Sequence, residues 1–258
     1  TGGDNVAIGV EALTTNTTGS DNVAVGKAAL KLSTTASNNT AVGNAALAAN
    51  TTGTENVAVG SSALDANTTA SFNTAVGYSA LSANTTGTQN TAVGQNSLAT
   101  NTTGNYNVAV GQAALKDNTG SQNTAVGMKA LFENSSADNN TALGYNALLN
   151  NTTGNNNVAV GSLTLDANTT GTKNTAIGQA ALGKNTTAGS NTAVGQGALQ
   201  ENTTASNNTA LGVDALNQNT TGTANTAIGT GSSDAITTGD SNTSVGYESL
   251  GQNQTGVD

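Results

Sequence analysis

Residues 39–55 read Asn-Thr-Ala-Val-Gly-Asn-Ala-Ala-Leu-Ala-Ala-Asn-Thr-Thr-Gly-Thr-Glu, and this 17-residue unit decides the fold. Its opening pentad, Asn-(Thr/Val)-Ala-(Val/Ile/Leu)-Gly, recurs fifteen times, the last copy with Ser in place of Ala. Every interval is 17 residues except the one from Asn107 to Asn123, which is 16. Residues 1–258 are therefore predicted to form a single repetitive domain. The copies begin at Asn5, Asn22, Asn39, Asn56, Asn73, Asn90, Asn107, Asn123, Asn140, Asn157, Asn174, Asn191, Asn208, Asn225 and Asn242.

The repeat has fixed and variable positions, which we number from its Asn. Position 1 is always Asn, position 5 is always Gly, and position 3 is Ala except at Ser244. Position 4 is Val, Ile or Leu, position 9 is Leu except at Ser233, and position 12 is Asn except at Ser33 and Ile236. Positions 13 to 15 are mostly Thr-Thr-Gly or Thr-Thr-Ala. Positions 6, 7, 10, 11, 16 and 17 vary, and we expect them to face water.

The composition follows from this repeat. Asn and Thr make up about a third of the 258 residues, whereas charged residues are only 8%. The large aliphatic residues are scarce, as in a disordered chain, but a net charge of −9 is low for disorder. Each coil of a repeat fold needs only a few apolar residues in fixed places, so the scarcity is compatible with an ordered structure.

The period and the residue types predict an all-β, parallel β-solenoid of about fifteen coils. Seventeen residues are too few for a helical-hairpin repeat, and Thr, Val, Asn and Gly favour strands and turns. Positions 2 to 4 are predicted to form a short strand whose side chains alternate between two faces. The Gly at position 5 ends it, a second extended stretch runs through positions 8 and 9, and the Asn-Thr-Thr-Gly run turns the chain. Fifteen coils would stack to about 70 Å.

The asparagines at position 1 and the glycines at position 5 are the predicted structural residues. Stacked coils lie about 4.8 Å apart, so asparagines in register can form an amide ladder. The alternative interpretation is that Asn only tolerates a turn conformation, and the two are compatible. In the first coils these ladder and turn residues are Asn5, Gly9, Asn22, Gly26, Asn39, Gly43, Asn56 and Gly60.

The small residue at position 3 suggests a close packing neighbour. It lies opposite the bulky face of the strand, and a solvated position would drift to larger polar residues, yet it stays Ala or Ser. The neighbour is either a second strand of the same chain or another chain. Two or three bulky groups per coil also offset little of the entropy lost when a coil is ordered. We therefore expect a homo-oligomer, with a trimer favoured over a monomeric solenoid or a filament of laterally or end-to-end associated chains.

The pentads Asn5-Val6-Ala7-Ile8-Gly9 and Asn22-Val23-Ala24-Val25-Gly26 resemble the YadA-like head repeats of trimeric autotransporter adhesins. The longer unit is similar to repeats of bacterial surface proteins and phage tail-fibre proteins. This resemblance implies a left-handed parallel β-roll assembled as a trimer, outside the cell, on a cell surface or a virion. The 17-residue unit is longer than the usual adhesin-head unit, and the chain shows neither a membrane anchor nor a chaperone domain.

The sequence offers no catalytic, metal-binding or cofactor-binding residues. It has no Cys and no His, which removes disulfides, thiol nucleophiles, Ser-His pairs and histidine metal sites. Asp65, Asp166 and Asp234 share position 10, but in coils far apart, so no recurrent carboxylate pair forms. Gly2-Gly3-Asp4 is only a fragment of a calcium-binding repeat. Six Lys+Arg against 15 Asp+Glu argue against nucleic acid, and no apolar run could span a membrane.

Two surface features remain as candidates for binding. Exposed aromatic residues suit a host-surface glycan or protein, and Tyr78, Tyr145, Tyr247, Phe72 and Tyr106 are the candidate contacts. Threonine-rich solenoids also suggest ice binding, which needs outward Thr at alternate positions of one strand. The adjacent pair at positions 13 and 14 should instead diverge.

We therefore expect a structural fibre, the stalk or head of an extracellular adhesin, surface filament or phage tail fibre. It would act as a rigid spacer and in surface attachment, with an ice-binding solenoid as the alternative. No enzymatic activity is expected.

Overall fold

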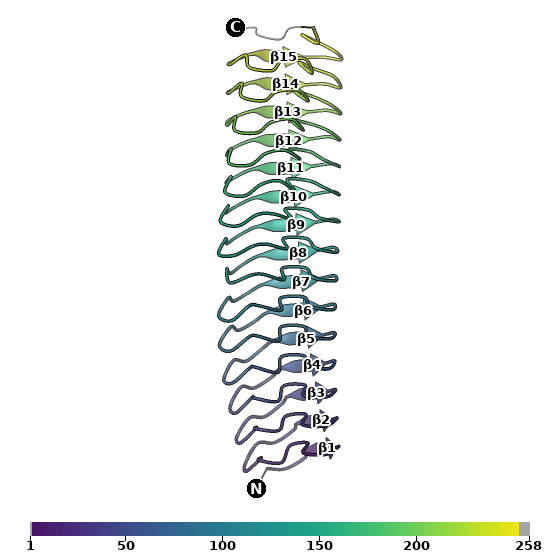
Figure 1. The fold of residues 1–258 in the computed structure, drawn as a ribbon, viewed down its shortest axis with the longest axis vertical. Coiled ribbons are helices and arrows are strands. Elements are labelled where there is room, and N and C mark those ends of the chain that lie inside the picture. Colours follow the sequence, from purple (N-terminus) through teal and green to yellow (C-terminus); the bar gives the residue numbers. More distant parts are fainter. Residues whose placement is uncertain (1, 253–258) are drawn as a thin grey trace. The chain divides into compact units, whose positions relative to one another are not determined.

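The computed structural model describes residues 2–252 and shows a parallel β-solenoid without helices in that range. The chain divides into two compact units, Thr1–Met128 and the residues from Lys129 onward. Each repeat contributes one three-residue strand from positions 2 to 4 (Figure 1). The first unit holds β1 (Val6–Ile8), β2 (Val23–Val25), β3 (Thr40–Val42), β4 (Val57–Val59), β5 (Thr74–Val76), β6 (Thr91–Val93), β7 (Val108–Val110) and β8 (Thr124–Val126). The second holds β9 (Thr141–Leu143), β10 (Val158–Val160), β11 (Thr175–Ile177), β12 (Thr192–Val194), β13 (Thr209–Leu211), β14 (Thr226–Ile228) and β15 (Thr243–Val245).

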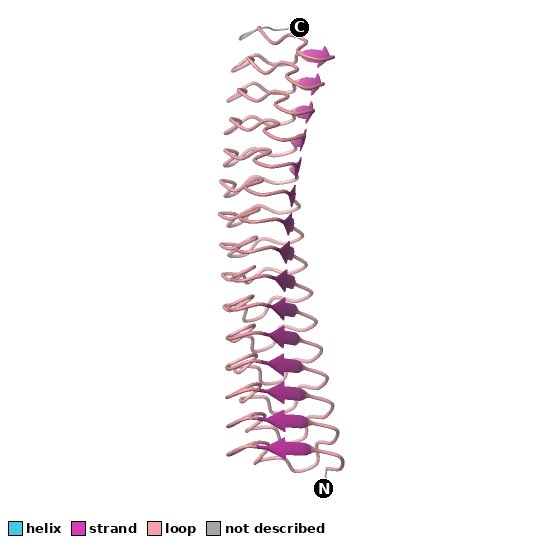
Figure 2. Cartoon of the chain, turned by 90° about the vertical axis from the view of Figure 1, so that its right-hand side faces the viewer, coloured by secondary structure: helices cyan, strands magenta, loops and turns pink. Residues whose placement is uncertain are grey.

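Within each unit, every strand pairs in parallel with its neighbours in the sequence, and equivalent repeat positions lie opposite one another. In the first unit Thr74 lies opposite Thr91 and Val76 opposite Val93. In the second, Thr192 lies opposite Thr209. The strands occupy one side of the coils and the turns close them on the other (Figure 2). This register places the side chains of one repeat position above one another along the stack.

Backbone hydrogen bonds join the coils well beyond the strands. In coil after coil the N–H of position 7 donates to the position 6 carbonyl of the coil before, as from Ala45 to Lys27 at 2.8 Å. The N–H of position 9 donates to position 8 of the coil after, as from Leu47 to Ala63 at 2.9 Å. The turns are therefore part of the stack, although only three residues per coil are strand.

The predicted second extended stretch through positions 8 and 9 is wrong. Those residues lie in turns, and the leucine at position 9 has a left-handed backbone, with φ of 52° at Leu47 and 53° at Leu64. This conformation costs a residue with a Cβ about 1–2 kcal/mol. Burying a leucine side chain gains about 1.5–3 kcal/mol. Leu47 and Leu64 are fully buried, so the left-handed turn is tolerated because it directs the largest side chain of the coil inward.

The alanines at position 3 face the interior of their own coils. Ala41, Ala58 and Ala75 are fully buried, as are Ala46 and Ala63 at position 8. Hence the packing neighbour that keeps position 3 small belongs to the same chain. Of the two alternatives raised by the sequence, another chain is not needed at this position. The strand residues at positions 2 and 4 point outward instead.

Two columns of buried asparagine complete the interior. At position 1, the backbone N–H of Asn90 donates to Asn73 Oδ1 at 3.0 Å, and the Asn90 side chain donates to the same oxygen at 3.3 Å. At position 12, Asn84 Nδ2 donates to Asn67 Oδ1 at 3.0 Å. The columns meet at the carbonyl of position 15: Gly87 O accepts from Asn73 Nδ2 and from Asn84 Nδ2, both at 2.9 Å. Each coil is thus closed by its own two asparagines and tied through them to the next.

The shortened coil keeps both columns. The missing threonine lies in the turn between positions 12 and 15, where Asn118 Nδ2 still reaches Gly120 O at 2.9 Å and Asn101 Oδ1 at 3.1 Å. Asn123 N–H still donates to Asn107 Oδ1 at 3.0 Å. The loss of one residue is therefore absorbed by the outer turn.

Replacing Asn73 by Ala should destabilise the first unit by about 2 kcal/mol or more, because it orphans the buried N–H of Asn90 and removes one of the two donors to Gly87 O. Denaturant-induced unfolding measured by circular dichroism tests this. Asn44→Ala, at exposed position 6, is the matched control and should leave the midpoint unchanged. Equal effects of the two substitutions would contradict the role of the column.

Replacing Ser33 by Asn should stabilise the protein. Ser33 stands at position 12, is fully buried, and its hydroxyl has no hydrogen-bond partner. An asparagine there would connect Asn16 to Asn50 in the position 12 column and gain about 1 kcal/mol. The melting temperature measures the gain. A melting temperature below that of the wild type would show that the position 12 column does not accommodate an asparagine at this coil.

Candidate functional surface

The outward face of the strands in each unit is the most regular surface of the molecule. Position 4 exposes an aliphatic side chain in many coils, with exposed fractions from 36% at Val93 to 68% at Val245. Position 2 adds Val in five coils and Thr in the other ten. Neither position carries a charge in any coil. Each unit therefore presents two uncharged rows of β-branched or aliphatic side chains spaced by the strand separation of about 4.8 Å.

The threonines at positions 13 and 14 diverge, as predicted. Position 13 hydroxyls bind along the stack, for example Thr51 Oγ1 to Thr68 O at 3.0 Å and Thr152 Oγ1 to Thr169 O at 3.0 Å. Position 14 residues such as Thr52 and Thr86 are exposed. Position 13 of the recurrent Thr-Thr pair is thus engaged in hydrogen bonds along the stack, and only position 14 forms an outward row.

Position 16 varies less freely than the sequence suggested. It holds Ser, Thr, Asn, Asp or Gly in every coil but the last, where the residue is Val257, and its side chain often accepts the N–H of position 16 in the coil before. Ser71 Oγ accepts from Thr54 N–H at 2.9 Å, and Asn105 Oδ1 accepts from Thr88 N–H at 2.8 Å. In the sequence, the restriction of position 16 to short polar residues indicates this third column of hydrogen bonds.

The five aromatic candidates are all exposed and fall into two groups. Tyr78, Tyr145 and Tyr247 stand at position 6, Tyr78 in the first unit and the others in the second, where Tyr145 and Tyr247 are six coils apart and are not brought together. Phe72 and Tyr106 stand at position 17 of the first unit, two coils apart, with exposed fractions of 52% and 56%.

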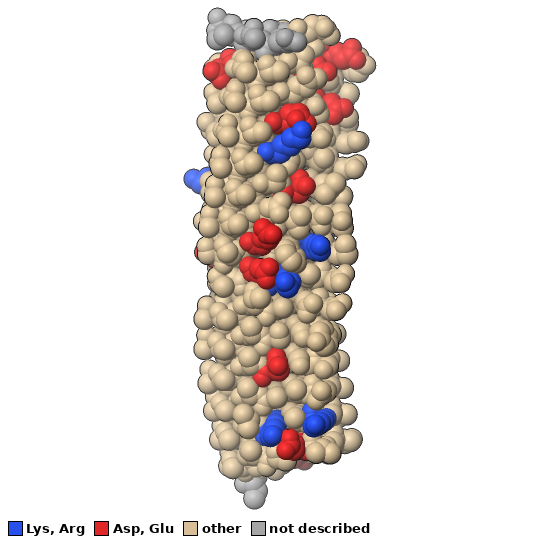
Figure 3. All heavy atoms as spheres, viewed as in Figure 1, with Lys and Arg blue, Asp and Glu red and all other residues tan. Residues whose placement is uncertain are grey.

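The titratable groups form no constellation that resembles an active site. Charged side chains are sparse on the face drawn in Figure 3. Partial burial raises the pKa values of Asp65 and Asp166, which lie in different units. The described residues hold no cluster of three or more acidic, His or Cys side chains that could bind a metal ion.

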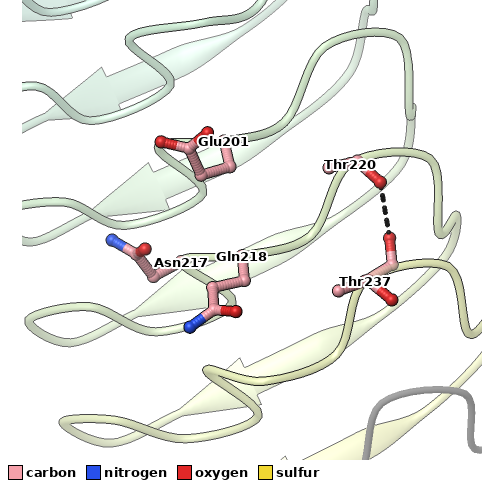
Figure 4. Close-up of a pocket in the computed structure, with 5 residues that line it drawn as sticks. All are labelled: Glu201, Asn217, Gln218, Thr220 and Thr237. Atoms are coloured by element: carbon pink, nitrogen blue, oxygen red, sulfur yellow. Dashed lines mark hydrogen bonds between the residues drawn. The ribbon is translucent and has the colours of Figure 1, made fainter.

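The pocket in Figure 4 lies on the second unit and has a single carboxylate. Its lining is Glu201, Asn217, Gln218, Thr220 and Thr237. Glu201 is already paired with Lys184 at 2.6 Å, and Thr220 Oγ1 donates to Thr237 O at 3.0 Å. Glu201 and Thr220 are therefore engaged in joining coils. So is Asn217, whose Nδ2 donates to Gly197 O at 3.0 Å.

The coil beginning at Asn225 exchanges its polar and apolar interior positions. Ser233 replaces the leucine of position 9, while Ile236 replaces the asparagine of position 12, and both are buried. Ser244 Oγ lies 2.6 Å from both Ser232 Oγ and Ser233 Oγ, and Ser249 Oγ lies 2.9 Å from Ser232 Oγ. These hydroxyls satisfy one another, so the irregular coil is a locally repacked interior.

Among the described residues, no helix is long and apolar enough to cross a membrane. Comparison of the chain with protein-family models, with curated proteins and with solved structures found no match.

Proposed function

We propose that this chain is a structural shaft of an extracellular fibre, in an adhesin stalk or head, a surface filament or a phage tail fibre, at a cell surface or on a virion. Its work is mechanical: it separates and presents whatever lies at its ends. Copies associate side by side, with a trimer as the expected assembly. The proposal rests on one observation: position 4 exposes a row of aliphatic side chains, although the interior of each coil is filled without them.

The stacked hydrogen bonds support a role as a rigid spacer. Nearly every coil is tied to the next by backbone bonds in the strand and the turns and by the asparagine columns. Such nearest-neighbour stacking gives solenoids their cooperativity and stiffness. Charged residues are only 8% of the chain, so little of this stiffness depends on ion pairs that salt would screen.

The sheet face supports association between copies. A solvated strand face normally carries polar side chains, whereas here position 4 is aliphatic in all fifteen coils. Contiguous exposed apolar rows of this kind mark interaction surfaces. Because the face is uncharged and repeats at each coil, a second copy of the chain offers it a surface of the same spacing.

The mass in solution, measured by light scattering, tests the association; three chains of 25.0 kDa are expected in each particle. Replacing Val76 and Val93 by Lys should release monomers, because it places charges in the shared apolar face. The matched control replaces Thr86 and Thr103, on the exposed position 14 row of the same coils, by Lys and should leave the mass unchanged. A wild-type mass of one chain would contradict the proposal.

The alternative function, ice binding, is favoured by one observation in the second unit. Position 2 is Thr in five consecutive strands, from Thr175 of β11 to Thr243 of β15, and lies beside the aliphatic row of position 4. This is an outward pair at alternate positions of one strand, the arrangement that positions 13 and 14 fail to make. Regular hydroxyl and methyl groups on a rigid, uncharged face suit ordered water.

Thermal hysteresis of freezing tests this alternative, and it should disappear when Thr192 and Thr209 are replaced by Lys. Lysine at Thr204 and Thr221, on position 14 of the same coils, should leave it unchanged. A face packed against other copies cannot also contact ice. A monomer with thermal hysteresis therefore favours ice binding, whereas a trimer without it favours the shaft.

A further inference from the structure

One row of the first unit combines aromatic and amide side chains at a regular spacing. In five successive coils, position 17 holds Glu55, Phe72, Gln89, Tyr106 and Gln122. All five are exposed. We propose that Phe72, Gln89 and Tyr106 form a platform that binds an extended, neutral β-1,4-linked glycan. This inference goes beyond the structural role and does not depend on it.

The backbone holds the three residues in one repeated orientation. Their φ angles are 64°, 58° and 59°, so each has the same left-handed conformation. Each N–H donates to the position 16 carbonyl of the coil before: Phe72 to Thr54 at 3.2 Å, Gln89 to Ser71 at 3.3 Å and Tyr106 to Thr88 at 3.1 Å. The Cα–Cβ bonds therefore point in one direction, and the side chains leave the surface as a row.

The spacing of this row matches an extended glycan. Phe72 and Tyr106 are two coils apart, which is about 10 Å at the usual strand separation. In an extended β-1,4-linked chain alternate pyranose rings present the same face, and the advance per ring is close to the coil separation of about 4.8 Å. The first and third rings can stack on the two aromatic residues, and the middle ring then lies over Gln89.

The chemistry of the row suits neutral sugar rings. The C–H face of a pyranose packs against the electron-rich face of an aromatic ring. The amide of Gln89 offers both a donor and an acceptor to the hydroxyls of the middle ring. No position 17 residue of this unit is Lys or Arg, which leaves an anionic glycan without a counter-charge.

Tyr78 provides the internal comparison. It is exposed and belongs to the same unit, but two coils further along its own row at position 6 stands Gln112, not a second aromatic residue. A single aromatic residue can stack with one ring only. Tyr78 is therefore not expected to contribute to binding.

Isothermal titration with cellohexaose and xylohexaose, together with affinity electrophoresis in the parent polysaccharides, tests the platform. Wild-type protein should bind at least one hexasaccharide. Phe72→Ala or Tyr106→Ala should each weaken binding about tenfold, whereas Tyr106→Phe and Tyr78→Ala should bind as wild type does. The α-1,4-linked maltohexaose, which coils, should bind at least about tenfold more weakly.

A double substitution that moves the second aromatic residue to the adjacent coil is a more stringent test. The double substitution Gln89→Tyr and Tyr106→Gln keeps the composition but moves the aromatic residues to adjacent coils. It should lose binding about as much as Tyr106→Ala, with an unchanged circular dichroism spectrum. Wild-type affinity in this variant, or binding of neither hexasaccharide by the wild type, would overturn the proposal. Either outcome leaves the mass measured by light scattering unaffected, so failure of the platform is distinguishable from failure of the shaft.

Discussion

The hydrogen bond between a buried asparagine amide and the carbonyl of position 15 is the contact on which the rest of the structure depends. Asn73, at the start of the coil, and Asn84, before its final turn, both donate to Gly87 O. A buried amide without partners would cost several kcal/mol, so these asparagines are stable only where coil closure and stacking occur together. The polar interior thus enforces one register, since a slipped coil would leave a column of amides unsatisfied.

This constraint explains why so few large side chains suffice. The space between the asparagine columns is filled by small residues at positions 3 and 8 and by one leucine at position 9. The leucine reaches that space from a left-handed turn, at a conformational cost smaller than the gain from its burial. With Ala41 and its equivalents inside, the branched residues of the strand are left to the outer face, which sets the surface available for partners.

Much of this architecture can be predicted from the sequence, because a 17-residue period of strand and turn residues allows few other folds. The three-residue strands, the glycine that ends them and the stacking of identical positions follow from the pattern around Asn39. The direction of the strand faces does not, since alternation alone cannot tell which side of Ala41 is inside. Local propensity does not predict the left-handed turn at Leu47 either, because the burial of the leucine in the finished coil outweighs its backbone preference. The second asparagine column resembles an ordinary turn signal at Asn50, and its ladder becomes visible only when coils are stacked. For the candidate surfaces, the aromatic residues could be named from the sequence, but the shared orientation of Phe72 and Tyr106 required the backbone.

Amide hydrogen exchange at the asparagines of position 1 tests the central claim most directly. The backbone N–H groups of Asn73 and Asn90 donate to side-chain oxygens, not to a strand partner, so their protection reports the column itself. The account predicts that both exchange as slowly as the N–H of Gly77, which donates to the Val59 carbonyl in the adjoining backbone ladder. Exchange of Asn73 and Asn90 at the rate of an unprotected peptide, while Gly77 stays protected, would contradict it.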